Sequence, residues 1–273
     1  MNAPTIVDRD ADARLSALLR QTFPETHEWE YRYVDHEWSR IRHVFQSQIC
    51  EISGRRVLEF GCNIGASSIV MAHLGRRICI VACDISETFL TLARLNAARY
   101  GVSDAIQFVR LQEGAGLPFG DRTFDVITCN SVLEYVKPAD LPYIQRELDR
   151  VLRPGGHVVV LGTSNRLWPI EAHSRRWLVN YVPARFDRFF GHRLERGVWP
   201  RQIRSGFGPY EDVLAELGTE QYMGARNAAQ DSWGKRGTLK LAARFCAVFG
   251  LSPGFLTPYL FAILRKPPTQ PAR

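Results

Sequence analysis

Long apolar runs are missing from this sequence, and none reaches the length of a membrane-spanning helix. The longest late run, around Leu256–Leu264, is interrupted by Pro258. Met1–Asp10 contains no apolar core of signal-peptide length. Internal repeats and low-complexity segments are also missing, which excludes solenoids and fibrous proteins. We therefore expect a cytoplasmic protein.

Paired Cys-x-x-Cys spacing is missing as well, which argues against a zinc site or a disulfide framework. The six cysteines lie mostly within apolar, strand-like runs, as small buried residues do in a reducing compartment. They are Cys50, Cys62, Cys79, Cys83, Cys129 and Cys246. We expect neither a disulfide nor a bound metal.

With 273 residues, the chain can form one large α/β domain with an elaboration, but not two full-sized domains and a linker. Apolar runs of strand length alternate with segments of helical spacing from residue 54 to residue 162. This alternation predicts a doubly wound, mostly parallel sheet with helices on both faces. The expected strands are Arg56–Phe60, Arg77–Cys83, Ile106–Leu111, Phe124–Cys129 and Gly156–Gly162.

Helices are expected between these strands and on both sides of the core. The spacing predicts them over Glu37–Ile52, Ala66–Leu74, a segment that Ser86 caps and Gly101 ends, Ala139–Leu152, Pro209–Gly218 and Leu239–Phe249. Asp231–Gly237 is expected to form a loop, and Pro258–Lys266 a last strand. We divide the chain into an N-terminal helical segment (1–53), a core (54–162), an inserted helical cap (163–208) and a C-terminal completion of the core (209–273).

A glycine turn follows the first expected strand, and an acidic residue ends the second. Gly61 and Gly65 enclose the turn, and Asp84 lies nineteen residues after Gly65. Glycine lets a ligand approach the backbone, and a turn between a strand and a helix is expected to leave N–H groups free. Asp84 would reach a ribose diol. The pattern predicts a nucleotide-type cofactor site.

Four blocks in this order resemble the class I S-adenosylmethionine-dependent methyltransferases. They are Val57–Gly65 (VLEFGCNIG), Ala82–Ser86 (ACDIS), the stretch from Glu113 through Leu117-Pro118-Phe119 to Ile127, and Leu152–Gly156 (LRPGG). The resemblance covers roughly Arg56–Gly162. It implies a Rossmann-like fold and S-adenosylmethionine as the cofactor.

The resemblance also implies roles for single residues. Glu59 would hold the ammonium group of the cofactor, and Asp84 the ribose hydroxyls. Glu113 would face the adenine amino group, and the backbone carbonyl of Asn130 would meet the methionine end. The other predicted cofactor contacts are Gly61, Cys62, Gly65, Ile85, Gly114 and Tyr33.

The chain departs from the family pattern at two positions. Asn63 replaces a common middle glycine, but asparagine tolerates left-handed backbone, so the turn should be kept. Tyr135 stands where many relatives have histidine, which argues against a base at that position. Tyr33 belongs to the aromatic segment Trp29–Tyr33, whose rings would either attract a sulfonium cation or pack the N-terminal helix onto the sheet.

His173 is the candidate general base, and Glu171 would orient it. Both follow the fifth strand, whose C-terminal end borders the cofactor cleft in this topology. The alternative is that both residues only anchor the insert. Methyl transfer from a sulfonium mainly needs alignment of the acceptor, so a base is optional.

Residues 163–208 carry most of the net positive charge of the chain. Nine arginines and three acidic residues give this segment a balance of +6 within a total of +7. Together with its tryptophans and phenylalanines, this favours an acceptor with an anionic group, either small or lipid-linked. Solvation of short helices is the plain alternative. The absence of an RNA-binding module disfavours nucleic acid, and Leu239–Phe249 fits either a peripheral membrane helix or a core helix.

The sequence therefore predicts a methyltransferase that acts on a small or lipid-linked metabolite, with transfer to oxygen favoured over nitrogen and carbon. Two alternatives stay open. An NAD-dependent oxidoreductase would share the sheet but would have no use for the blocks at 113–127 and 152–156. A non-catalytic partner subunit would bind the cofactor without transferring its methyl group. The sequence does not indicate the oligomeric state.

Overall fold

A seven-stranded sheet with the strand order β3-β2-β1-β4-β5-β7-β6 organises the computed structural model. The expected α/β class and the mostly parallel sheet are confirmed. The structure describes residues 3–46, 50–171, 175–183, 186, 189, 196–213, 237, 241 and 257–268. The chain divides into two units, Met1–Thr128 and Cys129–Arg273.

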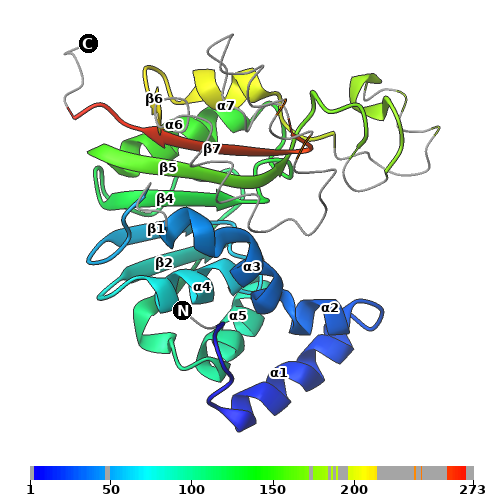
Figure 1. Cartoon of the computed structure of the whole chain (residues 1–273), viewed down its shortest axis with the longest axis vertical. Coiled ribbons are helices and arrows are strands. Elements are labelled where there is room, and N and C mark those ends of the chain that lie inside the picture. The colour runs from blue at the N-terminus through cyan, green and yellow to red at the C-terminus, as the bar shows by residue number, and fades with distance from the viewer. Residues whose placement is uncertain are drawn as a thin grey trace. The chain divides into compact units, whose positions relative to one another are not determined.

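Parallel strands form the centre of the first unit (Figure 1). Their middle residues, such as Leu58 and Val81, are at most 1% exposed, and a buried parallel sheet requires such continuous apolar runs. The strands are β1 (Arg56–Phe60), β2 (Cys79–Asp84) and β3 (Ile106–Arg110), with β4 (Phe124–Asn130) pairing with β1 through Val126–Thr128. The sequence predicted β1 with these bounds, and the others within two residues at each end.

Two helices connect these strands as expected. They are α4 (Ala66–Leu74) and α5 (Glu87–Arg99), and a 3-10 turn, η1 (Ser103–Ala105), precedes β3. The hydroxyl of Ser86 accepts a hydrogen bond from the N–H of Phe89 (3.3 Å), as an N-cap does. The periodic core of the sequence is thus the part that sequence reasoning located best.

The N-terminal segment contains three helices, α1 (Arg9–Thr22), α2 (His27–Tyr31) and α3 (Tyr33–Gln46). The prediction of one helix over Glu37–Ile52 was wrong in its bounds, because α3 begins at Tyr33 and residues 50–52 are not helical. No helix was predicted over α1, although the Asp8 carboxylate caps it by accepting from the N–H groups of Asp10 and Ala11.

An apolar cluster joins α1 to the rest of the first unit. It is made of Leu15 and Leu19 of α1, Ile64 of the glycine turn and Leu92 of α5, each at most 1% exposed. Ile64 lies between the two glycines of the turn. The helix that the sequence did not predict therefore packs directly against the turn.

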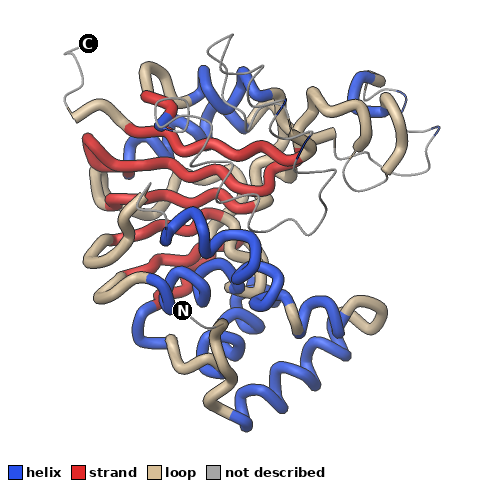
Figure 2. Tube along the Cα trace, viewed as in Figure 1, coloured by secondary structure: helices blue, strands red, loops and turns tan. Residues whose placement is uncertain are grey.

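The second unit is built on a long antiparallel pair. Strand β5 (Leu152–Ser164) runs beside β7 (Tyr259–Arg265), from His157 opposite Arg265 to Ser164 opposite Tyr259 (Figure 2). The predicted last strand, Pro258–Lys266, is confirmed. The other described elements are α6 (Leu141–Val151), η2 (Val179–Tyr181), α7 (Pro200–Gly206) and β6 (Glu211–Asp212).

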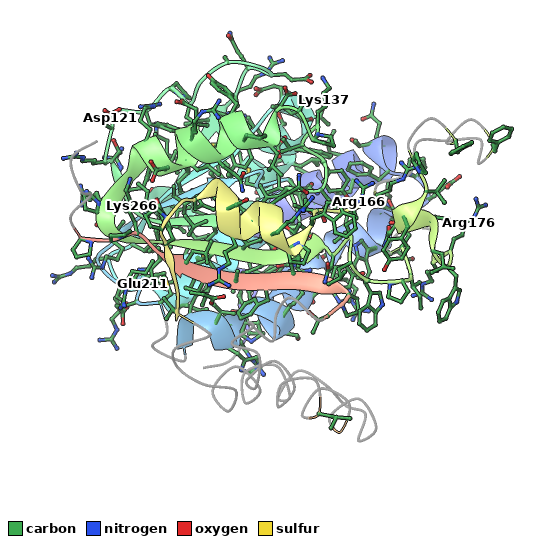
Figure 3. The ribbon with its side chains drawn as sticks, turned by 90° about the horizontal axis from the view of Figure 1, so that it is seen from above. Asp121, Lys137, Arg166, Arg176, Glu211 and Lys266 are labelled. Carbon is green, nitrogen blue, oxygen red and sulfur yellow. The ribbon has the colours of Figure 1, made fainter. Side chains whose placement is uncertain are left out.

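The predicted helix Pro209–Gly218 does not begin at Pro209, whereas Val213 is helical and residues 214–218 lie outside the described part of the chain. Glu211 and Asp212 form β6, which pairs with β7, and the Glu211 carboxylate accepts from the Arg265 guanidinium at 2.6 Å (Figure 3). This strand pairing overrides the local apolar spacing. The predicted helix Leu239–Phe249 and loop Asp231–Gly237 lie outside the described residues, apart from Leu241 and Gly237. Within the described part of the chain, no helix has the length and apolar character needed to cross a bilayer.

Candidate functional site

The glycine turn of the first unit uses left-handed backbone at three positions. The φ angles are 76° at Gly61, 48° at Asn63 and 77° at Gly65. Left-handed φ costs most residues roughly 1–2 kcal/mol and glycine and asparagine less. The expectation that Asn63 keeps the turn is therefore confirmed.

Four backbone N–H groups of this turn, those of Gly61, Cys62, Asn63 and Gly65, are occupied, although the turn was expected to leave N–H groups free. Gly61 and Cys62 both donate to the carbonyl of Cys83, at 2.9 and 2.8 Å, and Gly65 donates to the carbonyl of Cys62 at 2.8 Å. Asn63 donates to the Asp84 carboxylate at 2.9 Å. The turn folds back onto the end of β2, which places the Asp84 carboxylate against the turn.

Helix α5 fixes the turn from behind. A Cβ on Gly65 would lie 3.1 Å from the Cβ of Ala93, so α5 allows no larger residue there without a shift. The Asn96 side chain, which is 1% exposed, donates to the carbonyl of Ile64 at 3.0 Å. Gly65 therefore serves helix packing in addition to its left-handed backbone.

Asp84 is the last residue of β2, and its carboxylate is held by two backbone donors. One oxygen accepts from the N–H of Asn63 and the other from the N–H of Ser86, both at 2.9 Å. A carboxylate oxygen has two acceptor positions, so each keeps one for a ligand. The carboxylate is pre-oriented to accept from a pair of neighbouring hydroxyls.

Glu59 lies on β1 and is only 1% exposed. It accepts a hydrogen bond from the hydroxyl of Ser68 on α4. Burial raises the pKa of its carboxyl from 4.5 to about 8, and the nearby carboxylate of Glu37 adds to the rise, while the hydroxyls of Ser68 and Ser67 oppose it. A buried acid of this kind gains stability from a cation placed beside it.

Glu37 is an acidic residue near Glu59 that sequence reasoning missed. It is 1% exposed on α3, and Arg40 of the same helix pairs with it at 3.0 Å. Burial, and the negative charges of Glu37, Glu30 and Glu59, raise the pKa of Tyr33, so Tyr33 lies near this acidic pair. The sequence does contain a signal for Glu37, which lies on one apolar stripe of the helix, four residues before Ile41 and seven before Val44.

The remaining predicted contacts of the first unit follow the ends of β1, β2 and β3. Cys62 is buried, which raises the pKa of its thiol. Ile85 is 56% exposed, an unusual position for a large apolar side chain. The N–H of Leu111 donates to the carbonyl of Asp84 at 2.8 Å, so the exposed loop that carries Glu113 and Gly114 begins beside the tip of β2.

Three predicted site residues belong to the second unit. Asn130 is the last residue of β4 and is 8% exposed. Glu171 is 1% exposed, and its N–H donates to the carbonyl of Arg176 at 3.0 Å. His173 lies outside the described residues, so the pairing of Glu171 with His173 stays a prediction.

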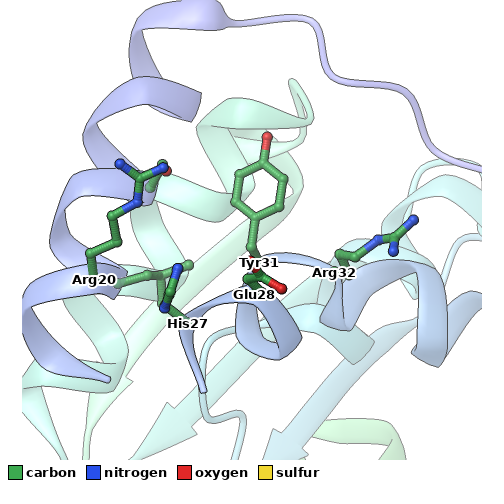
Figure 4. A pocket seen from close by; sticks show the side chains of 7 residues that line it. Arg20, His27, Glu28, Tyr31 and Arg32 are labelled. Carbon is green, nitrogen blue, oxygen red and sulfur yellow. The ribbon is translucent and has the colours of Figure 1, made fainter. Parts of the chain in front are cut away.

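A pocket of about 390 Å³ lies between α1 and α2 (Figure 4). Its charged side chains are of both signs, and no residue of the predicted cofactor set lines it. The lining residues are Ser16, Leu19, Arg20, His27, Glu28, Tyr31 and Arg32. The pocket is therefore separate from the groups at the ends of β1 and β2.

The groups at the ends of β1 and β2 fit S-adenosylmethionine. Buried Glu59 suits the ammonium of the cofactor, and the oriented carboxylate of Asp84 suits a ribose diol. Exposed Ile85 offers an apolar surface beside Asp84. The fold and these groups define the class I methyltransferases.

Comparisons with known proteins agree with this class. A family model described as a methyltransferase domain matches residues 57–156. A ubiquinone biosynthesis O-methyltransferase of Pseudomonas aeruginosa is 30% identical over 202 residues, which cover 72% of this chain and 82% of that protein. A demethylmenaquinone methyltransferase of Lactiplantibacillus plantarum is 28% identical over 168 residues, covering 61% and 70%. The chain belongs to the S-adenosylmethionine-dependent methyltransferases.

A solved structure supports the fold. An S-adenosylmethionine-dependent methyltransferase of Mesorhizobium loti superposes with a TM-score of 0.51 at 17% identity, covering 82% of this chain and 96% of that one. At this identity the likeness concerns the fold alone. The family model and the sequence relatives identify the chain as an enzyme of the methyltransferase class, with S-adenosylmethionine as its cofactor.

Proposed function

We propose that this methyltransferase acts on an oxygen of a small or lipid-linked metabolite. The match to the Pseudomonas aeruginosa O-methyltransferase carries the proposal, because its 202 residues extend well beyond the methyltransferase domain at 57–156. The names of both relatives point to quinone biosynthesis, so a lipid-linked quinone precursor is the first acceptor to test. Transfer to carbon or nitrogen is the alternative.

Different residues of the chain bind the cofactor and the acceptor. Bound S-adenosylmethionine supplies a methyl group on a positively charged sulfur, which an acceptor displaces in line. Glu59 holds the ammonium end and Asp84 the ribose, which fixes the direction in which the methyl group points. Residues 163–208 take the acceptor side, and the segment 1–53 covers the cofactor. In support of that cover, α1 packs on Ile64 of the turn.

Formation of S-adenosylhomocysteine measures the proposed activity directly. The purified protein is incubated with S-adenosylmethionine and demethylated quinone precursors bearing a free hydroxyl, and the methylated product is identified by mass spectrometry. We expect product formation that depends on the acceptor, with the new methyl on oxygen. A methyl on carbon would overturn the O-transfer proposal, and cofactor binding without turnover on any acceptor would favour a non-catalytic partner subunit.

His173 is proposed as the general base, oriented by Glu171. Replacing His173 with alanine is expected to lower kcat about 100-fold, because a positioned base contributes roughly 10²–10⁴ to proton transfer. Binding of S-adenosylhomocysteine should not change. The control is His157→Ala, since His157 lies in the N-terminal half of β5, where the pairing with β7 begins. An unchanged rate for His173→Ala at every pH would leave acceptor alignment as the whole mechanism.

We also propose a cytoplasmic location and peripheral contact with a membrane. The buried thiols of Cys62, Cys83 and Cys129 fit a reducing compartment. Two large apolar side chains of the insert, Trp177 and Phe189, are 69% and 68% exposed, which supports contact with a lipid surface or a lipid-linked acceptor. Co-sedimentation with phosphatidylglycerol vesicles tests that contact.

A further inference from the structure

Two segments of the second unit lie side by side although about thirty residues separate them. Asn165 forms a parallel bridge with Val198, the N–H of Val198 donates to the carbonyl of Ser164 at 2.9 Å, and the N–H of Arg166 donates to the carbonyl of Val198 at 3.0 Å. Gly197 has a φ of 72°, and a Cβ there would lie 2.2 Å from the oxygen of Ser164. Only glycine allows this approach, which brings Arg166 next to Arg196 and Trp199.

These side chains form an arginine–aromatic cluster, defined as Arg166, Tyr181, Arg196 and Trp199. The guanidinium carbon of Arg166 is 5.4 Å from the centre of the Trp199 ring, and the Tyr181 ring is 6.4 Å from that ring. The Tyr181 hydroxyl donates to the carbonyl of Leu167 at 2.7 Å, which anchors the ring. Figure 3 shows Arg166 close to α7, which Trp199 immediately precedes.

The two arginines of the cluster place like charges near each other, with Arg166 half-buried and Arg196 buried. Arg196 is 7% exposed, and its Nε donates to the carbonyl of Val182 at 2.8 Å. Burial and the positive charge of Arg196 both lower the pKa of Arg166. The Nε of Arg166 is buried without a hydrogen-bond partner, and no carboxylate among the described residues pairs with this arginine.

A buried hydroxyl beside the cluster is also unpartnered. Ser164 is 3% exposed and faces Gly197, and its Oγ makes no hydrogen bond within the described part of the chain. Of the described carboxylates near this segment, Glu134 accepts from the N–H of Ser164 at 3.3 Å through one oxygen, and Glu171 is buried. The Nε of Arg166 and the hydroxyl of Ser164 are therefore unmet donors beside a guanidinium, and an oxyanion stabilises such surroundings.

We propose that Arg166, Arg196 and Trp199 form a subsite for an oxyanion, a carboxylate or a phosphate, that the methyl acceptor carries in addition to its reacting group. The planar guanidinium of Arg166 presents paired N–H donors that match such a group, and the Trp199 ring keeps that guanidinium in place. This inference rests on the proposed function for the identity of the carrier. It narrows the acceptor to molecules with a negative charge.

The test compares two probes that differ in one group. 3,4-Dihydroxybenzoate and catechol share the same diol, and only the first has a carboxylate. Calorimetry in the presence of S-adenosylhomocysteine is expected to give at least ~10-fold tighter binding of 3,4-dihydroxybenzoate, because charged hydrogen bonds to a guanidinium supply that difference. Inorganic phosphate should compete with it.

Substitutions of Arg166 test whether the subsite causes the preference for 3,4-dihydroxybenzoate over catechol. Arg166→Gln should remove the preference, and Arg166→Lys should retain part of it, because lysine keeps the charge without the fork. The matched control is Arg204→Gln, which removes an exposed arginine of α7 and should leave the preference intact. An equal preference in the wild type and in Arg166→Gln, or equal affinities for both probes in the wild type, would overturn the proposal.

Two further measurements separate the possible failures. Binding of S-adenosylhomocysteine alone is followed in every variant, so its loss in the wild type would count against the methyltransferase site and not against the subsite. Co-sedimentation with phosphatidylglycerol vesicles tests a lipid surface as the source of the anion. If vesicle binding depends on Arg166 and the calorimetry shows no preference for 3,4-dihydroxybenzoate, the anion that Arg166 binds belongs to a membrane lipid and not to the methyl acceptor.

Discussion

Replacing Asp84 with alanine is expected to weaken the binding of S-adenosylhomocysteine about 100-fold or more, because each hydrogen bond to the charged carboxylate contributes roughly 1.5–3 kcal/mol. The carboxylate is held in place by the N–H groups of Asn63 and Ser86, so its remaining acceptor positions are fixed before the ligand arrives. Isothermal titration calorimetry at constant pH measures the loss.

The control for this substitution is Asp125→Ala. Asp125 also accepts a backbone hydrogen bond, from the N–H of Arg56 at 2.8 Å, but at the opposite ends of the parallel strands. Its loss should reduce stability without changing ligand affinity. 5′-Methylthioadenosine, which has the ribose but no amino-acid part, should lose affinity for Asp84→Ala as strongly as S-adenosylhomocysteine does. Full affinity in Asp84→Ala would refute the ribose assignment.

Glu59 is expected to make both folding and cofactor binding depend on pH. Its carboxyl has a pKa of about 8 in the folded protein, against 4.5 for an ordinary glutamate. A raised pKa stabilises the fold only while the group is protonated, so this contribution is complete below pH 4.5 and is lost as the pH rises through 8. The loss amounts to at most ~5 kcal/mol relative to Glu59→Gln. Urea unfolding of both proteins from pH 4.5 to 8.5 measures the difference.

Binding of the cofactor's ammonium group should reverse the preference of Glu59 for its protonated form. Because a cation beside Glu59 favours the ionised carboxylate, S-adenosylhomocysteine is expected to release about one proton on binding near pH 7. Calorimetry in two buffers of different ionisation enthalpy counts the protons. Glu59→Gln should release none, should bind S-adenosylhomocysteine at least ~10-fold more weakly, and should keep its affinity for 5′-methylthioadenosine. The same proton release in both proteins would contradict the role of Glu59.

The two substitutions test different ends of one ligand. Asp84→Ala should weaken the binding of both S-adenosylhomocysteine and 5′-methylthioadenosine, whereas Glu59→Gln should weaken the binding of S-adenosylhomocysteine only. If the substitutions only loosened the glycine turn, the affinity for both ligands would instead fall in both variants. The pattern across two ligands and two variants therefore separates direct contacts from damage to the fold.

Sequence reasoning succeeded where local periodicity and turn chemistry agree. Strand β1 and helix α4 have the predicted bounds, because a glycine turn separates an apolar run from a helical one. Ser86 and Asn63 also act as their residue types suggested. These features depend on neighbours within a few residues.

The failures depend on partners that are distant in the sequence. The amides of Gly61, Cys62 and Asn63 are occupied because the end of β2 lies against them. Strand β6 forms because β7 offers an edge to Glu211 and Asp212. Local spacing contains neither partner. Glu37 was missed for a related reason, since a single charge on an apolar stripe is significant only when the buried Glu59 is known to lie near it.

The contact of α1 with Ile64 connects the order of the N-terminus to the affinity for the cofactor. Ile64 belongs both to the glycine turn and to the apolar cluster with Leu15 and Leu19. If the turn is well formed only when α1 is docked, the free energy of docking is part of the measured affinity. A loss of those leucines would then weaken the cofactor without removing any atom that contacts it. By reciprocity, the bound cofactor should then stabilise the docked helix and lower the fraction of molecules in which that helix is frayed.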